Sequence, residues 1–215
     1  MVLNETGDEL EYFGKGLSPF FLSLSLWFGG LILYMVMQPI NRRAIDSGTP
    51  VFRVVLDTLV PSFLVGTVQA FLLWAVQVFL LDIDPVHTGT LLLVLVGVSW
   101  AFISFIYMLN CIFGKAIARL LTMALMSLQL VASNGLYPPE VQPKFIQWVH
   151  SWDPMRYSVN LMRYALFGTN GGDPRMIRAT LVLVGIAVGS WVVSCLGLKH
   201  LRQIPERDLH PELSV

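Results

Sequence analysis

The chain has 215 residues, of which 55% are hydrophobic and only 13% are charged. Soluble domains have about 45–50% apolar and about 25% charged residues. The composition, together with a mean hydropathy of +0.66, therefore excludes a soluble domain and predicts a membrane protein. The formal net charge is zero, which leaves no basic excess to attract nucleic acid. We expect the lipid bilayer as a partner and no nucleic acid.

Five apolar segments are long enough to cross a bilayer. A membrane helix needs about 20 mostly apolar residues, because every backbone polar group must be satisfied within the segment. In chain order the segments are residues 19–37, 54–81, 91–109, 117–133 and 177–198. The second is longer than a bilayer requires and contains Pro61 and Gly66, so its first turns should stand in the interface or kink. The predicted fold is an all-α polytopic membrane protein with five transmembrane helices.

The distribution of Lys and Arg predicts the orientation. With an outside N-terminus, the first inner loop carries Arg42 and Arg43, whereas the acidic N-terminal tail carries a single Lys15. We expect a multi-pass protein of the cell (plasma) membrane, with the N-terminus outside and the C-terminus cytoplasmic. Its parts are an external tail at 1–17, a transmembrane domain at 18–199 and a cytoplasmic tail at 200–215. The first apolar run is too long for a signal peptide, and no basic region precedes it.

The inner loop at residues 38–50 is the most polar inner connection. It is bounded by Pro39 and Pro50 and contains Arg42, Arg43 and Asp46, which are the candidate residues for docking a partner. In the alternative reading, the arginines only anchor the topology.

The connection at 134–175 is the longest one, and it is predicted to hold two external amphipathic helices. The first shows a helical stripe made of Phe145, Trp148, Val149 and Trp152. The second has Asp153 as N-cap, Pro154 at the first helical position and Gly168 as C-cap. Its apolar stripe consists of Met155, Val159, Met162 and Leu166. Because Trp and Tyr favour the interface, both helices should lie on or dip into the outer leaflet. The alternative is a small helical cap packed on the bundle.

Two long stretches carry a resemblance to a known family. They are GKGLSPFFLSLSLWFGGLILY and FGKAIARLLTMALMSLQLVASNGLYPPEVQPKFIQWVHSWDPMRYSVNLMRYALFG. Together they resemble the C-terminal membrane region of the YhgE/Pip (phage infection protein) family, which belongs to the type-two ABC exporter permeases. The resemblance covers nearly the whole chain. The family pattern falls on Ser133, Asn134, Gly135, Tyr137, Pro138, Pro154, Met155, Tyr157, Asn160 and Arg163.

The resemblance implies a dimeric permease whose halves have six helices, with partly re-entrant helices between the last two. Because the chain has five predicted spans, it also implies either a reduced version or a partner chain that supplies the missing first helix and ectodomain. Further implied partners are a second permease half, in a homo- or hetero-oligomer, and a separate ABC ATPase. The candidate external gate comprises Gly135, Pro138, Pro139, Trp148, Trp152, Pro154, Tyr157, Asn160 and Arg163.

The sequence offers no enzymatic chemistry. It contains no GxxxxGK[ST] phosphate loop, so the chain alone is not expected to hydrolyse ATP. All four histidines fall in predicted loops or tails, and Cys111 and Cys195 match no metal or redox spacing. Asp57, the acidic residue inside a span, follows Arg53 at i, i+4, which favours an ion pair over a proton relay. We predict no enzyme activity, no cofactor, no metal and two free thiols.

Several polar and small residues fall at membrane depth. Gln69, Gln77, Asn110 and Gln129 form a candidate intramembrane polar path, although such side chains more often join helices by hydrogen bonds. Small residues at steps of four should lie in helix contacts of the bundle or of a dimer seam; they are Ser62, Gly66 and Ala70, and Gly185 and Gly189.

These observations predict a permease subunit that exports a hydrophobic or cell-envelope substrate. The alternative is a non-transporting membrane scaffold, such as a phage receptor or a secretion-system subunit. The two functions share this fold, so the sequence does not separate them.

Overall fold

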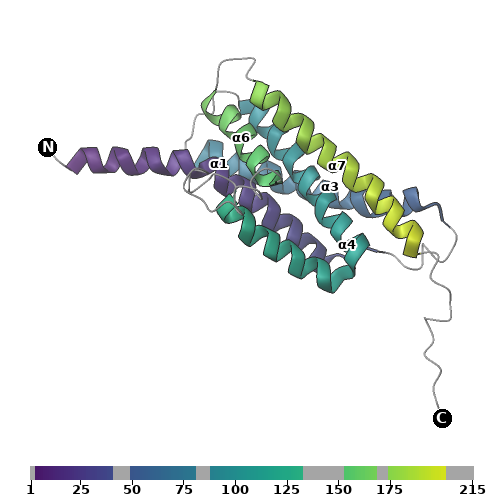
Figure 1. Cartoon of the computed structure of the whole chain (residues 1–215). Coiled ribbons are helices and arrows are strands. Elements are labelled where there is room, and N and C mark those ends of the chain that lie inside the picture. Colours follow the sequence, from purple (N-terminus) through teal and green to yellow (C-terminus); the bar gives the residue numbers. More distant parts are fainter. Residues whose placement is uncertain (1–2, 41–48, 81–87, 133–152, 169–173, 202–215) are drawn as a thin grey trace, which may run out of the picture.

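The computed structural model describes residues 3–40, 49–80, 88–132, 153–168 and 174–201, and the regular elements in these ranges are all helical. They are α1 (Leu3–Val36), α3 (Val51–Ala75), the π-helix η1 (Val76–Leu80), α4 (Thr88–Ala132), α6 (Pro154–Phe167) and α7 (Pro174–Leu201). Within the described ranges, four segments are long and apolar enough to cross a membrane: Gly16–Val36, Val51–Leu80, Thr88–Leu130 and Met176–Lys199. Figure 1 shows the long helices gathered in one bundle.

Helix α4 reverses direction at Gly114. This residue has φ 73° and ψ 166°, a non-helical conformation that glycine adopts readily. The Trp27 ring packs on Phe102 with centroids 5.1 Å apart, and its Nε1 donates a hydrogen bond to the Thr122 carbonyl at 3.4 Å. In a straight helix these two positions would stand about 30 Å apart. One side chain contacts both because the chain turns back at Gly114, so that residues 88–113 and 115–132 both run alongside α1 (Figure 1).

Helix α1 runs along both halves of α4, parallel to the first and antiparallel to the second. Tyr34 packs on Tyr107 of the first half with ring centroids 5.9 Å apart. From the second half, the Arg119 guanidinium donates a hydrogen bond to the Met35 carbonyl at 3.2 Å. Both contacts lie close to the reversal of α4, at what we call the Gly114 end of the bundle. The opposite end is packed against α6 and is called the α6 end.

Helix α6 begins and ends where the sequence predicted. Asp153 Oδ1 accepts a hydrogen bond from the Met155 N–H at 2.9 Å, Pro154 opens the helix, and Gly168 with φ 64° ends it. The predicted apolar stripe is buried: Met155, Val159, Met162 and Leu166. This face packs against α1, α4 and α7, so protein covers it, as the helical-cap alternative requires. The companion helix predicted at 145–152 lies outside the described residues.

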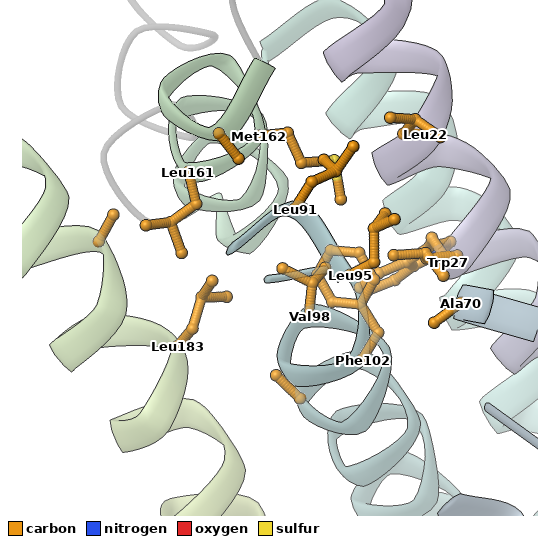
Figure 2. Close-up of a cluster of buried hydrophobic side chains, with 14 of the residues drawn as sticks. Leu22, Trp27, Ala70, Leu91, Leu95, Val98, Phe102, Leu161, Met162 and Leu183 are labelled. Carbon is orange, nitrogen blue, oxygen red and sulfur yellow. The ribbon is translucent and has the colours of Figure 1, made fainter. Parts of the chain in front are cut away.

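A hydrophobic core joins α6 to the long helices. Its side chains come from α1, α3, α4, α6 and α7, and Trp27, Leu95 and Phe102 are fully buried in it. Figure 2 shows Leu161 of α6 and Leu183 of α7 facing each other in the same cluster. The core therefore fixes α6 on the long helices.

Helix α3 contains Pro61 and Gly66, for which the sequence predicted either first turns in the interface or a kink. It passes as one α-helix through Pro61 and Gly66, and the departure from α-helical geometry comes later, in η1. Proline removes the hydrogen bond to the carbonyl four residues earlier. That carbonyl belongs to Asp57, an exposed residue near the start of the helix. The helix therefore tolerates Pro61 without ending there.

Candidate functional site

Many of the predicted site residues lie outside the described residues. Among them are the docking candidates Arg42, Arg43 and Asp46, and Gly135, Pro138, Pro139, Trp148 and Trp152 of the external gate. The flanks of the docking segment are described, because α1 ends at Val36 and α3 begins at Val51. Val54 and Val55 at the start of α3 share a core cluster with Tyr34 and Tyr107. The docking segment therefore joins two helices at the Gly114 end.

The four remaining gate candidates lie on α6 and are half-buried: Pro154, Tyr157, Asn160 and Arg163. The helix that carries them is tied to α1 by polar contacts. Ser158 Oγ donates a hydrogen bond to Ser23 Oγ at 2.8 Å, and Ser23 Oγ approaches Met162 Sδ at 3.3 Å. These serines are completely buried. If the bundle opens at the α6 end, either this contact between α6 and α1 breaks or the two helices move together.

Asp153 is a buried carboxyl group at the start of α6. It is 2% exposed, and its Oδ2 has no hydrogen-bond partner among the described residues. Burial raises the pKa of Asp153 to about 7, and this increase is limited by hydrogen bonds from the backbone N–H groups of Met155 and Arg156 and by the charge of Arg156. The N-cap that the sequence predicted is therefore also a carboxyl group that changes charge near neutral pH.

Of the predicted polar path, Gln69 of α3 and Gln77 of η1 hold this span to α1. Ser18 Oγ donates a hydrogen bond to Gln77 Oε1 at 3.0 Å, and Gln69 Nε2 donates to the Ser25 carbonyl at 2.8 Å. Gly29 lies so close to Gln69 that an added Cβ would overlap the amide. Both glutamines thus make the helix-joining hydrogen bonds of the alternative reading.

The two other path candidates stand at opposite ends of the bundle. Asn110 lies near the Gly114 end and donates a hydrogen bond to the Ile106 carbonyl of its own helix at 2.8 Å. Gln129 is buried near the α6 end, next to Leu130, which packs on Phe20. The side-chain oxygens of Asn110 and Gln129 have no hydrogen-bond partner among the described residues. A path along the bundle remains a prediction.

The two sets of small residues have different surroundings. Ser62, Gly66 and Ala70 are buried in the bundle, and an added Cβ at Gly66 would overlap Ile103 and approach Ser99 Oγ at 2.6 Å. Gly185 and Gly189 are exposed, and an added Cβ there would meet nothing within 4 Å. The first set is therefore a contact within the chain, whereas the second leaves an open strip on α7.

Sequence reasoning missed a group of buried hydroxyl and thiol side chains at the Gly114 end, which we call the tyrosine cluster. Its members are Tyr34 of α1, Thr58 and Ser62 of α3, Tyr107 and Cys111 of α4, and Ser194 of α7. A signal was present in the sequence. Thr58 and Ser62, and likewise Tyr107 and Cys111, stand four positions apart inside apolar spans, so each pair shares a helix face.

The fold and its polar contacts define a class: a polytopic α-helical membrane protein with polar contacts inside an apolar bundle. Residues 2–196 match the model of the ABC-2 family transporter proteins. The chain belongs to this family, which comprises membrane components of transporters. It is also 31% identical over 198 residues to the uncharacterized protein YhgE of Bacillus subtilis (strain 168), a match that covers 91% of this chain and 24% of that protein. The chain thus spans about a quarter of the length of the curated relative it matches.

Proposed function

We propose that the chain is a permease component of an exporter that moves a hydrophobic or cell-envelope substrate outward across the plasma membrane. The observation that carries this proposal is the family match over residues 2–196, which takes in all of the long helices except the end of α7. The bundle surface agrees with a lipid environment, since Val68, Leu72 and Leu181 are among its exposed large apolar side chains.

In this proposal the bundle crosses the membrane five times. Because α4 turns back at Gly114, each of its halves forms a separate crossing of roughly the length that a bilayer needs. The Gly114 end, where the segment with Arg42 and Arg43 joins α1 to α3, faces the cytoplasm. The N-terminus and α6 then lie on the outer side.

The permease works with a second half, which is either another copy or a partner chain. The open strip on α7 supports this part of the proposal, because small residues four positions apart let a neighbouring helix approach closely. Gly185 and Gly189 provide such a strip, and Leu181, Val188 and Val192 are exposed on the same helix. The second half is proposed to pack against this side of α7.

Helix α6 forms part of the external gate, and it can be locked in place. In protein that carries Cys111→Ala and Cys195→Ala, Ser23→Cys with Ser158→Cys replaces two hydroxyls that are 2.8 Å apart. Oxidation should join α6 to α1 and block substrate export from vesicles, and a reductant should restore export. Unchanged export by fully cross-linked protein would refute the gate.

A matched cross-link tests whether the effect is specific to α6. In protein that carries Cys195→Ala, Gly197→Cys places a Cβ 3.9 Å from that of Cys111, within the usual range of about 3.5–4.5 Å for disulfides. This bond joins α4 to α7 at the Gly114 end and leaves α6 free. Export that is blocked by the bond between α6 and α1 but not by this one would assign the effect to α6, whereas loss of export in both proteins would show that movement at either end is required.

The energy source is proposed to be a separate ABC ATPase that docks on the segment with Arg42, Arg43 and Asp46. The full chain is purified from membranes and its partners are identified by mass spectrometry. Arg42→Glu with Arg43→Glu should abolish capture of the ATPase, whereas the matched reversal Arg202→Glu with Arg207→Glu should leave it unchanged. Full capture by the first variant, with its membrane insertion verified, would refute the docking site. A complex with secretion components and without an ATPase would favour the scaffold over the exporter.

A further inference from the structure

The tyrosine cluster belongs to none of the sites proposed above. It brings together side chains from all of the long helices, with the rings of Tyr34 and Tyr107 at 5.9 Å. Around these rings, Tyr34 adjoins Ser62, Tyr107 adjoins Thr58 and Cys111, and Cys111 adjoins Ser194. The cluster is thus a continuous group of polar side chains inside the bundle.

Three hydroxyl groups of this cluster are buried without a hydrogen-bond partner among the described residues: those of Tyr34, Tyr107 and Ser194. Tyr34 is 2% exposed, and Tyr107 and Ser194 are 0% exposed. Buried polar groups are nearly always paired, either with protein or with bound water. Three unpaired hydroxyls in one cluster therefore indicate a site that holds a further hydrogen-bonding molecule.

The neighbouring hydroxyls show which hydrogen bonds remain available. Ser62 Oγ donates to the Thr58 carbonyl at 2.8 Å, and Thr58 Oγ1 donates to the Val54 carbonyl at 3.3 Å. Both hydroxyl protons are thus directed to the backbone of α3, and both oxygens can still accept. The Tyr34 and Tyr107 hydroxyls interact electrostatically with Ser62 and Thr58, but neither hydroxyl meets the distance and angle of a direct hydrogen bond to a described residue. Polar groups that lie near each other without a direct hydrogen bond are commonly bridged by water.

The chemistry of the cluster restricts the ligand. Its six residues carry hydroxyl and thiol groups and no formal charge, whereas a buried ion needs a charged or strongly coordinating partner. The ligand must therefore be neutral and must both donate and accept hydrogen bonds. It must also be small, because the three unpaired hydroxyls are sealed from solvent. Water meets all of these requirements.

We propose that the tyrosine cluster binds ordered water molecules that bridge Tyr34, Tyr107 and Ser194 to their neighbours on the adjacent helices. These bridges join α1 and α4 to α3 and α7 at the Gly114 end. At the α6 end the corresponding contacts are direct, as between Ser18 and Gln77. Water bridges rearrange more easily than direct side-chain bonds, so the Gly114 end is the end at which α3 and α7 can shift against α1 and α4.

Radiolytic footprinting of the full chain in lipid nanodiscs tests this proposal. Millisecond X-ray exposure makes hydroxyl radicals from bound as well as bulk water, and mass spectrometry measures the oxidation of each residue. After normalisation to the unfolded chain, Tyr34 and Tyr107 should be oxidised at least about fivefold faster than Trp27, which is equally buried in the apolar core. Equal rates at the three residues would overturn the proposal.

A variant distinguishes a water site from general access of radicals. Tyr107→Phe removes one water ligand and should lower the oxidation of Tyr34 at least twofold. The control Ser104→Ala removes a hydroxyl that donates to the Trp100 carbonyl at 2.7 Å and should change nothing. If Tyr107→Phe does not fold, Ser194→Ala takes its place with the same expectation. Unchanged oxidation of Tyr34 in a folded variant would show that no shared water bridges these groups, and would overturn the proposal.

Discussion

The pair α1 and α4 differs from the pair α3 and α7, although all four helices are strongly apolar. We compare the buried share of residues in the most apolar stretch of each candidate span. This share is 56% in α1 and in α4, but only 17% in α3 with η1 and 22% in α7. Helix α1 and the first half of α4 form the centre of the bundle, whereas α3, α7 and most of residues 115–130 of α4 face outward. Hydropathy predicts which segments enter a membrane, but it does not predict which of them are central.

The two pairs are also held by different contacts. Trp27 of α1 packs on two rings of α4, Phe102 and Phe105, and its Nε1 donates a hydrogen bond to the Thr122 carbonyl of the same helix. Helix α3 is held by two glutamines and by close approach at Gly66. Changes in the central contacts should therefore cost far more stability than equal changes on the outer pair.

The largest effect is expected for Trp27→Ala. Trp27 is fully buried, and truncation of such a side chain costs about 3–5 kcal/mol of unfolding free energy. The matched change is Trp100→Ala at the contact with α3. Trp100 is 42% exposed, stacks on Phe63 and donates to Thr67 Oγ1 at 3.1 Å, so we expect a loss of about 1–2 kcal/mol. Steric trapping in bicelles measures both values, and equal losses would remove the distinction between centre and periphery.

The free energy of unfolding is expected to depend on pH through the start of α6, the helix that packs on both central and peripheral helices. The pKa of Asp153 is about 7 in the folded chain against the ordinary value of 3.8. The folded state therefore binds more protons than the unfolded state between these values, and stability should fall as the pH rises from about 4 to about 7. The full change is on the order of 4 kcal/mol.

Asp153→Asn isolates this contribution, because asparagine also caps a helix but does not titrate there. Thermal melting in detergent across pH 4–8 should show a weaker pH dependence than in the unmodified chain, together with a higher melting temperature at pH 8. The control Asp57→Asn, on an exposed carboxyl group, should keep the original profile. An unchanged profile in Asp153→Asn would contradict the assignment.

Glycine substitutions distinguish packed from open helix faces. Gly29→Ala and Gly66→Ala force overlap with Gln69 and Ile103, so each should cost about 1–3 kcal/mol. Gly185→Ala meets no atom within 4 Å and should be neutral or should stabilise the chain by up to about 1 kcal/mol. SDS titration followed by circular dichroism gives the free energies. A large loss for Gly185→Ala in the monomer would show that this face is packed.

The smallest effect is expected for the hydrogen bond between Ser18 and Gln77. A double-mutant cycle with Ser18→Ala and Gln77→Leu should give a coupling of about 0.6 kcal/mol, the average for such bonds between membrane helices. The control cycle pairs Ser18→Ala with Gln69→Leu, whose partner is the Ser25 carbonyl. It should show no coupling. Coupling of the same size in both cycles would indicate a shift of the whole helix.

Local signals predicted α6 in detail, because they act within a few residues. An aspartate followed by proline sets the start of the helix, a glycine sets its end, and the spacing of Met155 and Val159 sets its buried face. The sequence also predicted that Ser62 and Gly66 are buried in a helix contact. In both cases the deciding interactions lie within the same helix or follow from side-chain size.

Local signals did not predict which distant segments of the chain pack against one another. Hydropathy separated the segments 91–109 and 117–133 on either side of Gly114, but it did not indicate that Trp27 contacts both halves of α4. The tyrosine cluster was missed for the same reason, since Tyr34, Tyr107 and Ser194 come from three helices. Gln69 and Gln77 illustrate an intermediate case: their shared helix face was visible, but their partners on α1 were not.

The single-residue reversal at Gly114 also restricts how the bundle moves. Two antiparallel helices joined by one residue cannot slide past each other, because the connection has no spare length. The halves of α4 therefore stay in register with each other, and Trp27 of α1 contacts both of them. In the proposed exporter, α3, α6 and α7 are then the helices left to move, with α1 and α4 as the frame.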